Sequence, residues 1–273
     1  MTDVMGPQPK QPKKSDLFVR SLSSIVLGPP VIAAVYFGAP YSSGLIYITA
    51  IILAWEWAKL CGRGALKQSG WFLISAIAII MALGVLEQFY VLYGLIPLLA
   101  AGMLCIARIQ FRENSKAIWY LIGLVYLSTS CLALLFLRNN PVNGLDVILW
   151  ILFVVWATDI GAYFAGRSIG GPKIAPKISP KKTWSGLVGG MVCAGLVSYL
   201  STIWLTLWEP LLLIIAGGLL AVISQMGDFF ESHLKRKFDA KDSSKLIPGH
   251  GGLFDRVDGL LACVLVVFVF QFF

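Results

Sequence analysis

The chain of 273 residues is 58% hydrophobic and only 13% charged, which argues against a soluble protein because soluble domains carry about a quarter charged residues. Its net charge of +8 comes from Lys and Arg that lie almost wholly between apolar runs, so membrane topology explains it before nucleic-acid binding does. The five cysteines are too far apart in sequence for a paired metal motif or a disulfide framework.

A proline- and lysine-rich tail occupies residues 1–16. We expect it to be disordered, and it contains no hydrophobic stretch of a cleavable signal peptide. Beyond it, nine apolar segments are long enough to cross about 30 Å of hydrocarbon. They lie near 17–37, 41–60, 71–86, 89–107, 117–137, 145–165, 185–207, 210–230 and 252–273. The sequence thus predicts an all-α, polytopic integral membrane protein with about nine transmembrane helices.

The connections between these segments alternate in charge. Every second connection is basic, as in the one that carries Lys59, Arg63 and Lys67, whereas those between them are nearly free of Lys and Arg. Since basic loops stay in the cytoplasm, the N-terminus is expected there, and nine spans place the C-terminus on the opposite side. We divide the chain into the tail, helices 1–5 (17–140) and a catalytic region of helices 6–9 (141–273) with two cytoplasmic loops.

Four aspartates lie at the cytoplasmic ends of the last spans: Asp159, Asp228, Asp255 and Asp258. A carboxylate in a membrane helix is costly unless it is paired, solvated or metal-bound, so each is a candidate functional residue. A salt bridge or an interfacial carboxylate is the alternative for any single one. Clustered carboxylates at one depth suit Mg²⁺, which prefers oxygen ligands. Asp255 and Asp258 share a helix face at a spacing of three residues.

The two cytoplasmic loops add groups that bind phosphate. Positive charge beside a metal is what phosphoryl or nucleotidyl transfer requires, because negative charge develops on phosphate oxygens. A glycine-rich turn, Pro248 to Gly252, runs into a helix N-terminus and offers backbone N–H groups to an anion. For this turn the alternative is a plain connector. For the other loop, Ser179 to Gly186 with Lys181 and Lys182, the alternative is a basic loop with a serine cap.

At these residues the sequence resembles the phosphatidate cytidylyltransferases, also called CDP-diacylglycerol synthases. Their signature is S-x-[LIVMF]-K-R-x(4)-K-D-x-[GSA]-x(2)-[LIF]-[PG]-x-H-G-G-[LIVMF]-x-D-R-[LIVMFT]-D, and residues 232–258 match it at every fixed position. The segment around Asp159-Ile160-Gly161-Ala162-Tyr163 and the segment from Ser179 to Gly186 also look like this family. The resemblance in motifs covers roughly residues 155–260.

The resemblance implies transfer of CMP from CTP to phosphatidate, with Mg²⁺ as cofactor. The phosphate of phosphatidate is already ionised, so no activated side chain is needed as nucleophile, and positioning and charge neutralisation carry the catalysis. The expected catalytic residues are Asp228, Asp255, Lys235, Arg236, Lys241 and Arg256. The expected metal ligands are Asp228 and Asp255 first, then Asp258 and Asp159. The expected substrate-binding residues are Ser179, Lys182, Thr183, Trp184, Ser185, Gly249, His250, Gly251 and Gly252.

Two other interpretations were weighed. The CDP-alcohol phosphotransferase motif begins at Asp258-Gly259, but Cys263 stands where that motif has Arg, so we reject it. An ion-coupled transporter that uses intramembrane carboxylates is the second alternative. The expected location is a bacterial inner membrane with the site on the cytoplasmic side, and the partners are CTP, phosphatidate and the bilayer, not nucleic acid. The pattern is compatible with a second cation such as K⁺ and with a homodimer, and it specifies neither.

Overall fold

The computed structural model describes residues 26, 28–110, 114–205, 208–247 and 251–271. Its long helices are α2 (Tyr41–Cys61), α3 (Gln68–Val85), α4 (Phe89–Gln110), α5 (Asn114–Asn139), α6 (Gly144–Ser168), α7 (Trp184–Ser201), α8 (Pro210–Lys237) and α9 (Phe254–Phe270). A shorter apolar helix, Gly28–Phe37, precedes them. Two short strands, β1 (Lys173–Ala175) and β2 (Ser179–Thr183), join α6 to α7.

Helices α2 to α8 are each long and apolar enough to cross a membrane, α5 from Ala117 onward. The protein is therefore an all-α integral membrane protein. Within the described residues, α9 is one turn shorter than expected and Gly28–Phe37 is shorter still. Nearly half of the expected first span, residues 17–25 and 27, lies outside the described residues, so the count of nine spans stays a prediction. The expected disordered tail lies outside them too.

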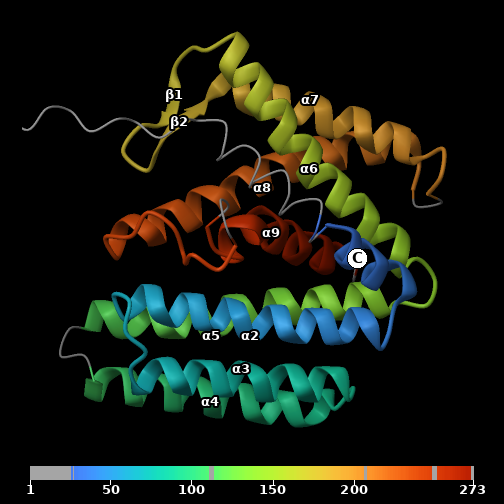
Figure 1. Cartoon of the computed structure of the whole chain (residues 1–273). Coiled ribbons are helices and arrows are strands. Elements are labelled where there is room, and N and C mark those ends of the chain that lie inside the picture. Colours follow the sequence, from blue (N-terminus) through green and yellow to red (C-terminus); the bar gives the residue numbers. More distant parts are fainter. Residues whose placement is uncertain (1–25, 27, 111–113, 206–207, 248–250, 272–273) are drawn as a thin grey trace, which may run out of the picture.

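The helices form a layered bundle in which α2 to α5 stack on one side and α6 to α9 on the other (Figure 1). One buried apolar cluster fills the space among α2 to α5 and also takes in Phe254 and Leu261 of α9. A second lies among α5 to α9, around Trp150 and Val154 of α6. Helix α9 thus packs into both cores and joins the two sides of the bundle.

The hairpin, the end of α8 and the chain that follows it lie at one end of the bundle, on the left of Figure 1. The connection after α2 reaches the same end, because Arg63 forms an ion pair with Asp239 there at 3.1 Å. The segment that joins α5 to α6 lies at the other end. The basic connections that the structure describes are therefore gathered together, as the charge pattern predicts.

Helix α7 packs tightly on α6 because small side chains face the contact. Gly186, Gly190, Ala194 and Ser198 recur every four residues along α7, and all four are buried. Small residues at this spacing let two membrane helices approach closely. The Trp150 indole of α6 donates a hydrogen bond to the Ser198 hydroxyl at 2.9 Å. This packing fixes the hairpin above the ends of α6, α7 and α8.

Two elements differ from the sequence expectation. Helix α8 continues seven residues past the expected end at 230, because its last two turns are amphipathic: Leu234 is buried while Lys235 pairs with Glu231 one turn back. The connection before α7 is a two-stranded antiparallel hairpin rather than an irregular loop, with Lys173 opposite Thr183.

Candidate active site

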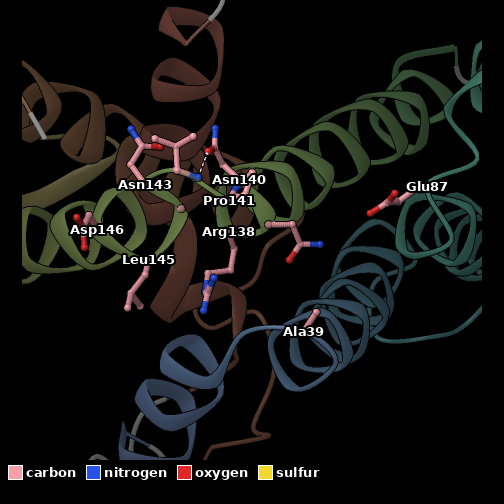
Figure 2. Close-up of a pocket in the computed structure, with 11 residues that line it drawn as sticks. Ala39, Glu87, Arg138, Asn140, Pro141, Asn143, Leu145 and Asp146 are labelled. Carbon is pink, nitrogen blue, oxygen red and sulfur yellow. Dashed lines mark hydrogen bonds between the residues drawn. The ribbon is translucent and has the colours of Figure 1, made fainter. Parts of the chain in front are cut away.

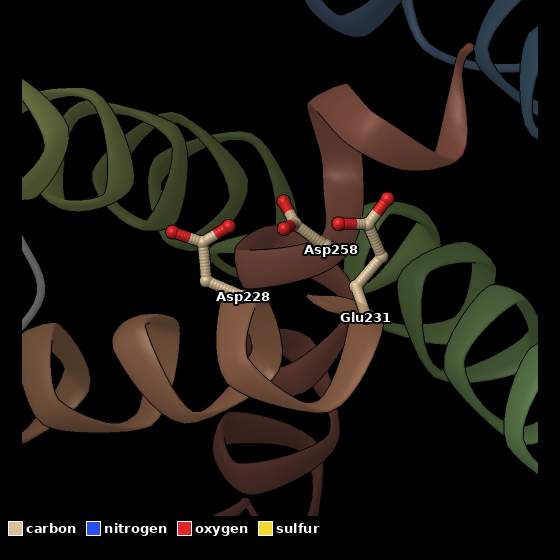
Figure 3. Close-up of side chains that lie close together, drawn as sticks. All are labelled: Asp228, Glu231 and Asp258. Carbon is tan, nitrogen blue, oxygen red and sulfur yellow. The ribbon is translucent and has the colours of Figure 1, made fainter. Parts of the chain in front are cut away.

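Three acidic side chains meet where α8 and α9 cross. Asp228 and Glu231 lie three residues apart on α8, and Asp258 reaches them from α9 (Figure 3). One carboxylate oxygen of each lies within 4.8 Å of the others, so the three could together hold a metal ion. Glycines permit the crossing, because a Cβ on Gly227 would lie 2.5 Å from the Asp258 carbonyl oxygen and one on Gly259 would lie 2.4 Å from the Ser224 hydroxyl.

This carboxylate cluster, Asp228, Glu231 and Asp258, is partly unsatisfied. The Glu231 side chain is 2% exposed and Asp258 is 8% exposed. Glu231 Oε1 and Asp258 Oδ2 have no hydrogen-bond partner within the described residues. A buried polar atom without a partner costs about 1–3 kcal/mol, and more when it is charged. Oxygen donors left open in this way suit a hard divalent cation.

Two lysines neutralise part of the acidic charge. Lys182, on β2, forms an ion pair with Asp228 and lies 4.5 Å from the centre of the Phe229 ring. Lys235 lies one turn beyond Glu231 on α8, and its Nζ is 2.6 Å from both Glu231 Oε2 and Asp255 Oδ1. Two ammonium groups thus face four carboxylates when Asp255 is counted. If all are ionised, two negative charges remain to be compensated.

Asp255 is fully engaged with the protein. Its Oδ2 accepts hydrogen bonds from the Ser243 backbone N–H at 2.9 Å, the Ser243 hydroxyl at 2.8 Å and the Gly252 backbone N–H at 2.8 Å, and its Oδ1 accepts one from Lys235 at 2.6 Å. It stands in the first turn of α9, where a carboxylate also complements the helix dipole. Asp255 therefore holds the loop before α9 against α8, and it lies outside the group of three.

A residue that the sequence analysis missed, Glu56 of α2, is fully buried beneath the same loop. It accepts backbone hydrogen bonds from Leu253 at 2.8 Å and Phe254 at 2.6 Å, which begin α9. It also accepts from the Ser244 hydroxyl at 2.6 Å and lies 3.2 Å from the Ser243 hydroxyl, whose single proton it shares with Asp255. An acidic residue inside an otherwise apolar span is costly and thus a functional candidate. The sequence therefore contained the signal that could have identified Glu56.

Glycine is required where the loop passes Glu56. A Cβ on Gly252 would lie 1.9 Å from the Ser243 hydroxyl and 2.5 Å from Glu56 Oε1. Gly251 has a φ of +88° and pairs with Ile247 through two backbone hydrogen bonds of 2.8 and 3.1 Å. The glycines of the signature therefore shape this turn. Gly249 and His250, expected to bind substrate, lie outside the described residues.

A pocket of about 200 Å³, called the polar pocket because four of its lining residues are charged, opens beside the carboxylate cluster. Its walls come from α6, the hairpin, the start of α7 and α8. It is lined by Asp159, Ala162, Tyr163, Lys181, Lys182, Thr183, Gly186, Leu187, Gln225 and Asp228. The pocket brings Asp159 together with Asp228 and Lys182, as the sequence analysis anticipated for a common site.

Other predicted site residues have different surroundings. Thr183 caps α7 by accepting a hydrogen bond from the Gly186 N–H at 3.1 Å, and the Ser185 hydroxyl donates to the Gly170 carbonyl. Ser179 is half-buried at the start of β2 and Trp184 is exposed. Arg236, Lys241 and Arg256 are also exposed, at the same end of the bundle. The structure thus gathers the predicted residues at one end without assigning each a role.

Comparison with known proteins decides the family. The model of the cytidylyltransferase family matches residues 18–273, nearly the whole chain. This chain belongs to the cytidylyltransferase family.

Curated relatives agree over nearly their full length. A phosphatidate cytidylyltransferase of Brucella suis is 35% identical over 261 residues, covering 94% of this chain and 93% of that protein. One of Rickettsia bellii is 32% identical, covering 95% and 92%. One of Haemophilus influenzae is 32% identical, covering 93% and 98%. The similarity thus also covers helices α2 to α5, which lie outside the family motifs.

Proposed function

We propose that this protein is a phosphatidate cytidylyltransferase, which converts CTP and phosphatidate to CDP-diacylglycerol and diphosphate. The observation that carries the proposal is full-length similarity to enzymes of that name. The site fits the reaction, because buried carboxylates and two lysines adjoin a polar pocket at the end of a membrane bundle.

In this reaction a phosphate oxygen of phosphatidate attacks the α-phosphorus of CTP. The new P–O bond replaces the bond to the β-phosphate, and diphosphate leaves with the electron pair. No proton must be removed from the nucleophile, so no general base is required. Lys182 is placed to hold a phosphate in the polar pocket. Arg236, Lys241 and Arg256 are exposed at the same end of the bundle and add positive charge that suits the remaining phosphates.

We assign the metal to Asp228, Glu231 and Asp258, and Asp159 is close enough to the same pocket to assist. The unpartnered oxygens of Glu231 and Asp258 support this assignment. Asp255, first choice from the sequence, is better explained as a positioning residue, since its oxygens already accept four hydrogen bonds. Mg²⁺ bound there would neutralise charge on the phosphate oxygens.

The proposed location is a bacterial inner membrane with this site on the cytoplasmic side, where CTP is available. The gathered basic connections support that orientation. An ion-coupled transporter is less well supported, because the carboxylates described here cluster at one end of the bundle beside cationic residues. Cation uptake into liposomes in the absence of nucleotide would favour the transporter.

The direct test is transfer of labelled CMP from CTP to phosphatidate by purified protein in mixed micelles, with and without Mg²⁺. We expect labelled lipid only when metal and phosphatidate are both present. Asp239→Asn is the matched control for the carboxylate variants, since Asp239 is exposed and pairs with Arg63 alone among the described residues. Absence of labelled lipid with every divalent metal and acyl composition would overturn the proposal.

A further inference from the structure

An apolar groove runs along the outer surface of the seam between α7 and α8. Its volume is about 590 Å³. It is lined by Val188, Met191, Val192, Gly195, Leu196, Ile214, Ile215, Gly218 and Leu219, and we call it the α7–α8 groove. Every lining residue is apolar or glycine. In a membrane protein this surface faces lipid or another protein.

The α7–α8 groove continues the polar pocket along the same two helices. On α7, Leu187 lines the pocket and Met191, one turn on, lines the groove. On α8, Gln225 lines the pocket and Gly218, two turns earlier, lines the groove. Residues spaced by four and by seven share a helix face. One continuous seam thus passes from the carboxylate cluster to the lipid-facing surface.

The chemistry along this seam changes in one direction. At the pocket end are Lys181, Lys182 and Thr183, which suit a phosphate. Exposed Trp184 stands at the start of α7, next to Thr183 of the pocket lining, and tryptophan is enriched at membrane interfaces. In the groove the lining is wholly apolar. A ligand that matches both parts has a phosphate head joined to a hydrocarbon chain.

We propose that one acyl chain of the lipid substrate lies in the α7–α8 groove while its phosphate occupies the polar pocket. The proposal rests on the proposed function and adds the place and orientation of the lipid. Because lipid tails are already in an apolar medium, shape and not hydrophobicity must select the chain. The stretch from Val188 to Leu196 rises about 12 Å, so the groove can guide several carbons next to the head group.

Glycine keeps the groove open. A Cβ on Gly218 would approach other atoms no closer than 4.0 Å, at the Met191 carbonyl oxygen, so the position has room for a Cβ, and a larger side chain would reduce the space in the groove that Gly218 lines. Gly218→Leu is therefore the informative variant. Gly94→Leu on α4 is its matched control, because a Cβ there also meets nothing within 4 Å and α4 lies on the other side of the bundle.

The first test compares phosphatidates with palmitoyl and hexanoyl chains in mixed micelles. For Gly218→Leu we expect KM for the long-chain lipid to rise about tenfold, as misfits in apolar pockets do, with KM for the short-chain lipid and for CTP unchanged. Gly94→Leu should match wild type. An equal rise in KM for both lipids, or no rise, would overturn the proposal. An equal rise together with a change in oligomeric state would assign the groove to a contact with a second copy of this chain instead.

The second test uses the wild-type protein and phosphatidate with a diazirine at the middle of one acyl chain. After irradiation we expect label in peptides containing 188–196 and 214–219, displaced by excess phosphatidate but not by phosphatidylcholine. Label spread over all lipid-facing helices and insensitive to phosphatidate would refute the groove. If wild type makes labelled CDP-diacylglycerol meanwhile, only the groove fails. If it makes none, the function itself fails.

Discussion

At the scale of single residues, the acidic groups at the α8–α9 crossing divide into two kinds. Asp255 and Glu56 have oxygens filled by donors from the loop before α9. Glu231 and Asp258 each keep a buried oxygen that no described residue satisfies. The first kind holds the protein in shape, and the second kind is open to a ligand. Replacing the two kinds by amides should therefore change the stability of the protein in opposite directions.

Replacing Asp258 by Asn should raise stability and strongly lower activity. Without metal, the wild-type acid is buried beside two other acidic groups with one oxygen unpartnered, so an amide, which can donate to a neighbouring carboxylate, should stabilise the protein by about 1–2 kcal/mol. Loss of a group that stabilises the transition state should lower kcat about 10²- to 10³-fold. Thermal unfolding in detergent with and without Mg²⁺, together with CMP transfer, measures both. At a hundred times its Kd, Mg²⁺ should stabilise the wild type by about 2.7 kcal/mol and so raise its Tm. The Tm of the variant should not change when Mg²⁺ is added. A destabilised variant that still responds to Mg²⁺ would contradict the assignment.

Replacing Glu56 by Gln should be destabilising instead. Each Glu56 oxygen accepts one backbone N–H, so either orientation of the amide sets its NH₂ against a backbone donor. We expect a loss of about 2–4 kcal/mol and faster proteolysis of the 238–253 loop. Glu87→Gln is the control, since Glu87 is exposed at the opposite end. An unchanged Tm would mean that the loop does not depend on this carboxylate.

Sequence alone could locate these residues but not separate the two kinds. The signature, residues 232–258, spans the end of α8 and the start of α9, and Asp228 lies one turn before it on α8, so the sequence predicts that Asp228, Asp255 and Asp258 lie near one another. Which of them stays unsatisfied depends on donors brought by packing. The Glu56 contact with Phe254 joins residues 198 positions apart, and no local pattern encodes that pairing.

At the scale of elements, the hairpin between α6 and α7 is the part that crosses over the site. Its second strand ends at Thr183, the cap of α7, so the strand direction is fixed by the helix that follows. That geometry sets Lys182 over α8, where it pairs with Asp228 and contacts the Phe229 ring. The hairpin therefore acts as a wall of the pocket that carries a cation.

Removing this cation should impair catalysis without unfolding the protein. For Lys182→Ala we expect kcat/KM to fall about 10²-fold, because a charge-assisted phosphate contact contributes about 1.5–3 kcal/mol. Lys177→Ala, in the exposed turn of the same hairpin, should change it less than about twofold. Steady-state kinetics in mixed micelles distinguishes the two. Equal effects from both lysines would show that the hairpin contributes only general positive charge.

Helix boundaries were predictable where the apolar run ends at a charged connection, as in α2 and α6, which end within about three residues of expectation. They were not predictable where a helix leaves the apolar layer and continues with an amphipathic pattern. The end of α8 is such a case, since Glu231 and Lys235 stabilise each other at 2.6 Å. The hairpin escaped prediction because its short, lysine-rich strands lack the alternation that marks a half-buried strand.

At the scale of the whole molecule, the two ends of the bundle differ in chemistry. One end carries the carboxylate cluster, the hairpin lysines and the loop before α9. The other carries a cavity of about 440 Å³ lined mainly by the segment from Arg138 to Asp146 (Figure 2). There the Arg138 guanidinium donates to the Val35 and Tyr36 carbonyl oxygens at 2.6 and 3.1 Å. This arginine thus binds carbonyl oxygens at the end of a helix, whereas Lys182 and Lys235 of the site pair with carboxylates.

This difference predicts an orientation of the bundle in the membrane, and the prediction can be measured. We expect the hairpin end to face the cytoplasm, because basic connections are retained there. Single cysteines at Lys177 and at Val142, which is 89% exposed, report on the two ends after the five native cysteines are replaced by serine or alanine. In intact cells, a thiol reagent that does not cross the membrane should label Val142→Cys and leave Lys177→Cys unlabelled until the membrane is opened. The reverse pattern would place the carboxylate cluster on the outer side, away from cytoplasmic CTP, and the proposed function would fail with it. Labelling of both in intact cells would mean that the segments between α5 and α7 cross the membrane differently from the span that α6 provides.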